Sequence, residues 1–225
     1  MEMNNEILFL LCNIVSLSFV LFLYRCLGKV GLIVWVAIAT VMVNIEVLKC
    51  VTMFGLAMTL GNVLYGSTFL ATDILSEQYG GKTARKAVLI GVACSVISTV
   101  IFQISLMFVP NEYDFASGAM KTIFALAPRI CISSLLCYYL SNTIDTYLYD
   151  FIRRSTGEKA LWLRNNGSTL ISQAIDSILF TLLAFGGMMP TSVLIELALS
   201  TYIAKVMVAI FDTPFMYMAK KIDKK

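Results

Sequence analysis

Charged side chains lie inside long apolar stretches of this 225-residue sequence. Ionisable groups in such surroundings are energetically costly, and they usually face a protein interior or the path of a solute. Uncharged polar side chains accompany them, so a solute could be bound by hydrogen bonds as well as by charge. The ionisable residues are Glu46, Asp73, Arg129, Asp176, Glu196, Lys205 and Asp212, and the neutral ones are Asn44, Asn142 and Gln173.

The chemistry open to these residues is limited by the absence of histidine. The sequence therefore has no Ser-His-Asp or Cys-His arrangement, no HExxH zinc motif and no histidine proton relay. The six cysteines lie mostly in apolar runs and show no CxxC spacing, so they predict neither a metal site nor a disulfide framework. We expect carboxylates, amides, lysine and arginine to bind a solute, with no enzymatic activity, no cofactor and no metal.

The composition indicates which elements must hold these residues. Hydrophobic side chains make up 59% of the sequence and charged ones only 14%, against about a quarter charged in soluble domains. This balance excludes a soluble globule and predicts an all-α integral membrane protein. A spanning helix needs about 20 apolar residues. The candidate spans are residues 7–24, 30–48, 56–76, 86–109, 119–148, 167–187 and 191–218.

The candidate spans predict a bundle of six to seven transmembrane helices. The first span lacks the basic segment and the small-residue cleavage site of a signal peptide, so we expect it to remain in the mature chain. Six spans stay open if this helix lies at the periphery. The second and third spans are separated only by a short connection at 49–55. Residues 1–225 are expected to form a single polytopic membrane domain.

The positions of the basic residues predict the orientation in the membrane. With the N-terminus outside, the outer loops hold only Lys49 and Lys121, and most of the other basic residues face the cytoplasm. This predicts a multi-pass protein of the plasma (inner) membrane with a cytoplasmic C-terminus. Because these residues lie in short loops, they predict no nucleic-acid partner. The basic residues on the predicted cytoplasmic side are Arg25, Lys29, Lys82, Arg85, Lys86, Arg153, Arg154, Lys159, Arg164, Lys220, Lys221, Lys224 and Lys225.

Three charged groups are expected near the middle of the bilayer. Arg129 and Asp176 lie about ten residues into their spans and Lys205 about fourteen, at a rise of about 1.5 Å per residue. We expect one cluster, in which Asp176 is the first candidate for the partner of Lys205. Glu196 is about 13 Å from Lys205 along the axis and on the opposite side of the helix, which excludes it as that partner. Pro128 predicts a kink beside Arg129.

Two polar stripes predict a cavity between the last two spans. Thr169, Gln173 and Asp176 share one helix face, and Tyr202, Lys205 and Asp212 nearly share a face on the next span. Two polar stripes on neighbouring helices imply that they face a common space.

An extended segment also resembles a known family. Residues 65–82, YGSTFLATDILSEQYGGK, are similar to the signature of the queuosine precursor transporters, also called the vitamin uptake transporter family. Shorter matches follow the family pattern in order over about residues 40–218. They are Asn44-Ile45 with Lys49, Pro128-Arg129-Ile130 before Ser133-Ser134, Leu163-Arg164-Asn165-Asn166 before Ser168-Thr169, then Gln173, Asp176, and Tyr202 with Lys205 and Thr213-Pro214.

This resemblance implies an importer of queuosine precursors, which are 7-deazaguanine bases such as queuine or its biosynthetic precursors. It implies a six-helix core at 29–219, similar to the substrate-binding components of vitamin transporters, with residues 1–28 as an additional helix. Asp212 is not something the family pattern demands. The candidate substrate-binding residues are Asn44, Phe69, Thr72, Asp73, Arg129, Gln173, Asp176, Tyr202 and Lys205.

Other functions stay open at this point. The same polar set would suit another small heterocyclic vitamin or a purine-like solute, and the chain could be the substrate-binding component of an ATP-driven vitamin importer. The sequence itself has no Walker motif. The expected partners are the small-molecule substrate and the lipid bilayer, while a homo-oligomer and an external energising module stay open.

Overall fold

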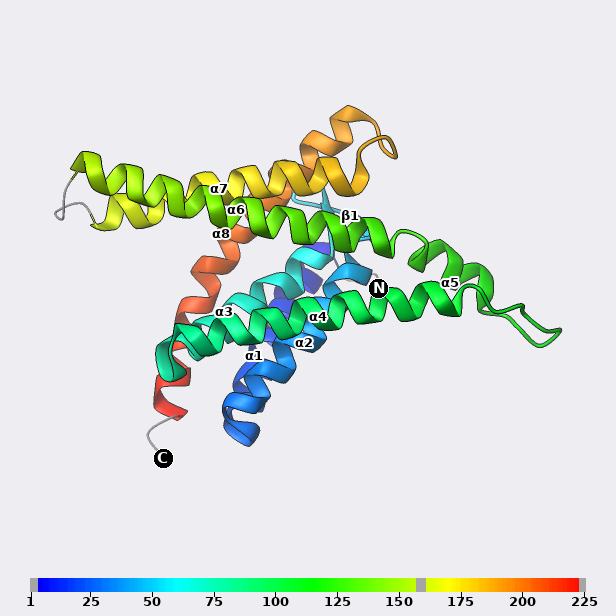
Figure 1. Ribbon diagram of the computed structural model, residues 1–225, viewed down its shortest axis with the longest axis horizontal. Coiled ribbons are helices and arrows are strands. Elements are labelled where there is room, and N and C mark those ends of the chain that lie inside the picture. Colours follow the sequence, from blue (N-terminus) through cyan, green and yellow to red (C-terminus); the bar gives the residue numbers. More distant parts are fainter. Residues whose placement is uncertain (1–3, 157–160, 223–225) are drawn as a thin grey trace.

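The computed structural model describes residues 4–156 and 161–222, which form a bundle of long helices (Figure 1). A hairpin of two short strands joins the second helix to the third, so the predicted all-α membrane bundle carries one small β element that was not predicted. The elements are α1 (Asn5–Leu27), α2 (Lys29–Glu46), β1 (Cys50–Met53), β2 (Leu56–Thr59), α3 (Gly61–Tyr79), α4 (Gly81–Ser105), α5 (Ser117–Phe124), α6 (Ala127–Thr156), α7 (Leu161–Phe185) and α8 (Thr191–Ile222).

The described residues include four stretches long and apolar enough to cross a membrane, Asn5–Leu27, Lys29–Glu46, Gly81–Ser105 and Ser117–Ser141. Helix α4 shows how such a stretch packs. Its buried residues, Ala87, Gly91 and Ser95, are all small and follow one another at four-residue spacing. A Cβ added at Gly91 would lie 2.8 Å from Oγ1 of Thr40 in α2, so the two helices touch closely there. Large apolar side chains such as Ile97 cover the remaining faces and are exposed, as on a lipid-facing helix.

Three buried clusters hold the described part of the bundle together, and the third of them packs the hairpin against α1, α3 and α8. The largest one joins α1, α2, α3 and α8 through residues such as Leu17, Leu32 and Leu70. The second includes Ile130 and Leu197, where α6, α7 and α8 meet. Burial of each such side chain contributes about 1.5–3 kcal/mol.

The hairpin is the main departure from the predicted spans. The predicted third span, 56–76, starts too early, because β2 occupies residues 56–59 and α3 begins at Gly61. The strands pair antiparallel, and the turn residues Phe54 and Gly55 have positive φ angles of 52° and 77°. Positive φ at both central residues is typical of the type I′ turn that closes two-residue hairpins. Hydropathy alone could not separate an apolar strand from the start of an apolar helix.

Side chains from both ends of the chain hold the hairpin in place. Oε1 of Glu6 in α1 accepts a hydrogen bond from the Phe54 N–H at 3.0 Å. On α8, Oε2 of Glu196 accepts from the Ala57 N–H at 3.2 Å, and Oγ of Ser200 donates to the Ala57 carbonyl at 2.7 Å. Glu196 therefore binds strand backbone.

The predicted span 119–148 is two helices. Helix α5 ends at Phe124 and α6 begins at Ala127. Pro128 has no N–H with which to bond the carbonyl of Phe124, four residues earlier, and that carbonyl accepts from Nε2 of Gln103 at 2.6 Å instead. Arg129 is consequently the third residue of α6, although it still lies near the middle of the apolar stretch Ser117–Ser141, as predicted for a spanning segment.

The connections divide between two ends of the bundle (Figure 1). The α1–α2 and α3–α4 turns, the end of α6, the start of α7 and the last turn of α8 lie toward the left and lower side of the view. The start of α1, the hairpin and the connection between α4 and α5 lie toward the other end.

Candidate functional site

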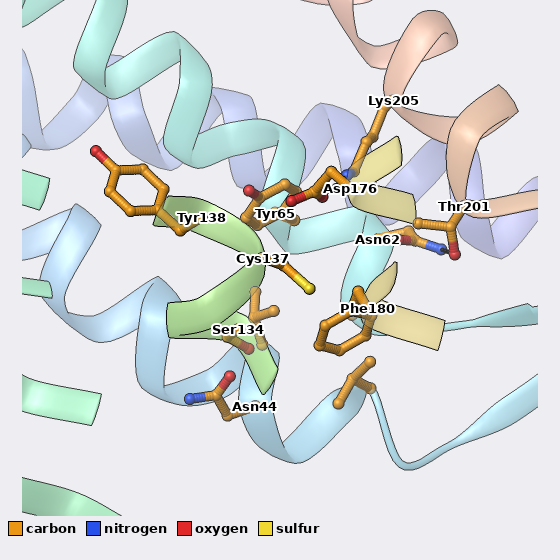
Figure 2. A pocket seen from close by; sticks show the side chains of 13 residues that line it. Asn44, Asn62, Tyr65, Ser134, Cys137, Tyr138, Asp176, Phe180, Thr201 and Lys205 are labelled. Atoms are coloured by element: carbon orange, nitrogen blue, oxygen red, sulfur yellow. Dashed lines mark hydrogen bonds and ion pairs between the residues drawn. The ribbon is translucent and has the colours of Figure 1, made fainter. Parts of the chain in front are cut away.

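A cavity of about 80 Å³ lies between α2, α3, α6, α7 and α8 (Figure 2). Every one of these helices contributes a polar side chain to its wall. The cavity therefore combines residues that are up to about 160 positions apart in the sequence. Its lining residues are Val43, Asn44, Val47, Gly61, Asn62, Tyr65, Ser134, Cys137, Tyr138, Asp176, Phe180, Thr201 and Lys205.

An ion pair between Lys205 and Asp176 forms the charged side of the cavity. The two side chains are only 9% and 13% exposed, so both charges are largely shielded from solvent. Nζ of Lys205 also lies 5.5 Å from the centre of the Tyr65 ring, close enough for a cation–π attraction. Removal of either partner would strand a buried charge. The predicted pairing of Lys205 with Asp176 is confirmed.

Aromatic rings make up two other parts of the cavity wall. Tyr65 packs edge to face against Phe69, with ring centres 5.0 Å apart. Phe180 packs in the same way against Phe185, at 6.2 Å. These second rings hold the first ones in position, so the cavity has two supported aromatic side chains on which a flat molecule could stack.

Two amide side chains complete the polar wall. Nδ2 of Asn62 donates to Oγ1 of Thr201 at 3.2 Å, and Nδ2 of Asn44 donates to Oγ of Ser95 at 2.6 Å. Within the described residues neither amide oxygen accepts a hydrogen bond. Both amides therefore keep an acceptor for a ligand.

The structure brings three of the nine predicted site residues to the cavity wall, Asn44, Asp176 and Lys205. Phe69 lies one layer behind, against Tyr65. The two polar stripes predicted for the last spans thus do contribute a residue each to a common space, although the cavity also needs α2, α3 and α6.

Gln173 lies one turn from Asp176 along α7, outside the cavity lining. Its Oε1 is buried and has no hydrogen-bond partner among the described residues. An unsatisfied buried acceptor is costly, so this oxygen is a contact still open to a ligand.

The other four predicted residues lie elsewhere. Oγ1 of Thr72 donates to backbone carbonyls of its own helix, Asp73 is exposed, and Tyr202 lines an apolar groove between α7 and α8. Arg129 closes the end of α7, with Nε and Nη2 donating to the carbonyls of Leu183 at 2.8 Å and Gly186 at 2.6 Å. The side chains of Thr169 and Asp212 lie outside the described set.

Sequence reasoning missed several residues of the cavity wall, above all Asn62, Tyr65 and Thr201. Asn62 and Tyr65 are three residues apart on α3, so they share a face and could have been paired by their helical spacing. Tyr65 also opens the segment 65–82 that carries the family resemblance. Thr201 lies one turn before Lys205 on α8 and could have been found in the same way.

A profile described as "Putative vitamin uptake transporter" matches residues 59–219. This stretch contains α3 to α7 and nearly all of α8, and most of the cavity wall. No solved structure matches the chain.

Three curated proteins are similar in sequence. A "Probable queuosine precursor transporter" of Bacillus subtilis is 42% identical over 221 residues, which cover 98% of this chain and 96% of that protein. The "Queuosine precursor transporter" of Escherichia coli is 28% identical over 165 residues, 71% of each chain. A "Probable queuosine precursor transporter" of Haemophilus influenzae is 26% identical over 133 residues, 59% of this chain and 54% of the other.

Proposed function

The chain belongs to the vitamin uptake transporter family, and we propose that it imports queuosine precursors, 7-deazaguanine bases such as queuine, without altering them. The observation that carries this proposal is the shielded ion pair of Asp176 and Lys205 beside a cavity inside an apolar helical bundle. Ionisable side chains inside a membrane-spanning bundle are energetically costly, and where they occur they usually mark the path of a solute. The names of the three relatives support the choice of substrate class.

The cavity wall suits the chemistry of a deazaguanine. This ring presents an N1–H and an exocyclic amine as adjacent donors, and a carbonyl as an acceptor. The carboxylate of Asp176 can accept both donors. Its two oxygens offer about four lone-pair sites, and Lys205 contacts only the Oδ2 oxygen. Lys205 can donate to the ring carbonyl and the amide oxygen of Asn62 can accept from a ring N–H, while Tyr65 and Phe180 supply stacking surfaces. A precursor with an aminomethyl group would add a positive charge that Asp176 could neutralise.

Binding requires the cavity to widen. Its volume of about 80 Å³ is well below the roughly 300–1,000 Å³ of common small-molecule sites. The substrate must therefore displace side chains, and separation of Lys205 from Asp176 is the change that would free the most polar contacts. If Lys205 leaves Asp176 only when the substrate binds, the two buried charges stay paired whenever the site is empty.

Import into the cytoplasm follows from the proposed orientation in the plasma membrane. The N-terminus lies outside, and the basic ends of α6, α7 and α8 lie inside. The substrate enters from the end of the bundle that carries the hairpin and leaves at the basic end.

An uptake measurement tests the proposal. Cells that cannot synthesise deazaguanines should take up labelled queuine when they express this chain, and unlabelled precursors should compete while riboflavin should not. Purified chain in proteoliposomes should do the same without another protein, which separates a self-sufficient importer from one component of an ATP-driven system. If queuine and its precursors neither enter nor compete, the proposed function is wrong.

A further inference from the structure

A second, narrower cavity of about 10 Å³ lies beside the central one, between α2, α4 and the junction of α5 with α6. Asn44 lines both cavities. Its Nδ2 donates to Oγ of Ser95, and Ser98 and Thr99 continue the polar wall along α4 away from the basic end. A line of polar side chains therefore connects the central cavity to a cleft nearer the outer end of the bundle.

Two stacked aromatic rings close this cleft. Phe102 of α4 and Phe124 of α5 lie with their ring centres 4.0 Å apart and their planes at 16°. Beside them, Nε2 of Gln103 holds the Phe124 carbonyl at 2.6 Å. A planar heterocycle can take the place of one ring in such a stack, because stacking uses the π face that every flat ring offers.

Helix α5 is the element on this path that the bundle holds least firmly. It has eight residues and none of them is buried. The break before Pro128 separates it from α6, so it can move without bending a continuous helix. Elements with few buried side chains open at a low free-energy cost. Neither cavity admits a bicyclic ring at its present size, so passage needs a movement of this kind.

We propose that the cleft between α4 and the α5–α6 junction is the entrance subsite, where a planar heterocycle takes the place of Phe102 against the ring of Phe124 before it reaches the central cavity. Asn44 is the polar contact at which the ring passes from one cavity to the other. This inference rests on the proposed function and deepens it, because it assigns the outer recognition step to residues that are distant from the ion pair.

A reversible cross-link tests the entrance subsite. The four native cysteines that are not buried, Cys12, Cys26, Cys50 and Cys94, are first replaced by serine, and Gln103→Cys with Ala125→Cys is added, because the side chain of Gln103 reaches the peptide that joins Phe124 to Ala125. Both aromatic rings and the cavity residue Cys137 stay unchanged. A short thiol cross-linker that a reductant can cleave then fixes α5 to α4. We expect the cross-linked protein to lose uptake of labelled queuine in proteoliposomes and the reductant to restore it, which also shows that the variant is folded. Phe9→Cys with Phe54→Cys is the matched control, because these rings are 6.5 Å apart and fix α1 to the hairpin at the same end.

The outcomes separate the two proposals. Uptake that persists with α5 fixed to α4 overturns the entrance subsite, and so does equal inhibition by the control cross-link. Absence of queuine uptake by the unchanged chain overturns the proposed function instead.

A second pair of variants tests the stacking contact without a cross-link. Phe124→Leu removes the aromatic face and should raise the KM of queuine uptake, whereas Phe124→Tyr keeps the face and should retain the original KM. Equal KM values for the two variants would contradict a stacking role.

Discussion

At the scale of single residues, the site depends most on the carboxylate of Asp176. It is shielded from solvent, pairs with Lys205 and faces a cavity that also holds Tyr65. A carboxylate in such a place serves either to neutralise the lysine or to bind a solute, and two substitutions separate these roles.

The substitution Asp176→Asn should abolish uptake while the protein still inserts in the membrane. The amide loses a charge-assisted hydrogen bond to the substrate worth roughly 1.5–3 kcal/mol. This corresponds to about ten- to hundredfold weaker binding. Uptake of labelled queuine at matched protein levels measures the effect. Glu112→Gln is the control, because Glu112 is exposed in the connection between α4 and α5 and lies outside the cavity lining. Near-normal transport by the Asp176→Asn variant would contradict the proposed role of Asp176 in substrate binding.

The double substitution Lys205→Met with Asp176→Leu should fold and insert but remain inactive. Replacement of a buried ion pair by apolar residues is often tolerated, so stability should return. Lys205→Met alone should be both inactive and less stable, because it leaves a buried carboxylate unpaired. Thermal unfolding in detergent and queuine uptake give the two readouts. Substantial uptake by the double variant would show that the pair is only structural.

At the scale of elements, four of the seven predicted spans correspond to long apolar stretches of the described residues, because hydropathy and helix length carry most of that information. Two local features could not be predicted in this way. The hairpin at 50–59 is as apolar as a helix, and only the Phe54-Gly55 turn distinguishes it. The break between α5 and α6 depends on Pro128 and on a hydrogen bond from Gln103, a residue 21 positions from its acceptor. Asn62 and Tyr65 share a helix face that the sequence shows, but the cavity that this face lines is formed only where α2, α6, α7 and α8 meet α3.

The break before α6 places Arg129 beside the end of α7, where it has a structural role. Its two hydrogen bonds reach carbonyls at the end of α7, which have no partners within their own helix. Arg129→Ala should therefore lower the thermal unfolding temperature, since each charge-assisted bond contributes roughly 1.5–3 kcal/mol. Queuine affinity of the folded protein should stay the same, because Arg129 does not line the cavity.

The unfolding temperature of Arg129→Lys should lie between those of the unchanged chain and Arg129→Ala. Lysine keeps the positive charge, but it lacks the rigid guanidinium group that donates to both carbonyls. Unfolding temperature and equilibrium binding in detergent check both variants. Unchanged stability together with lost binding would return Arg129 to the substrate site.

At the scale of the whole molecule, the bilayer explains both the apolar surface and the position of the site. Side chains such as Ile97 and Ile101 are more than half exposed, at 57% and 54%, because lipid covers them in place of water. The polar groups are turned inward, where helices from distant parts of the sequence meet. Their clustering is a property of the assembled bundle, and helical spacing in one span could predict only the part contributed by that span.

The topology is the prediction that belongs to this scale. Basic residues lie at the α1–α2 turn, the α3–α4 turn, the described end of α6 and the last turn of α8, toward the left and lower side of Figure 1. A cytoplasmic leaflet attracts such residues, so the start of α1 should lie outside. Cysteines engineered near Glu2 and Lys224 should react with an impermeant thiol reagent from outside and only after permeabilisation, respectively. If both termini are protected from the reagent in intact cells, α1 does not cross the membrane and six spans remain. The hydrogen bond between Glu6 and the hairpin would then not form at the outer end of the bundle.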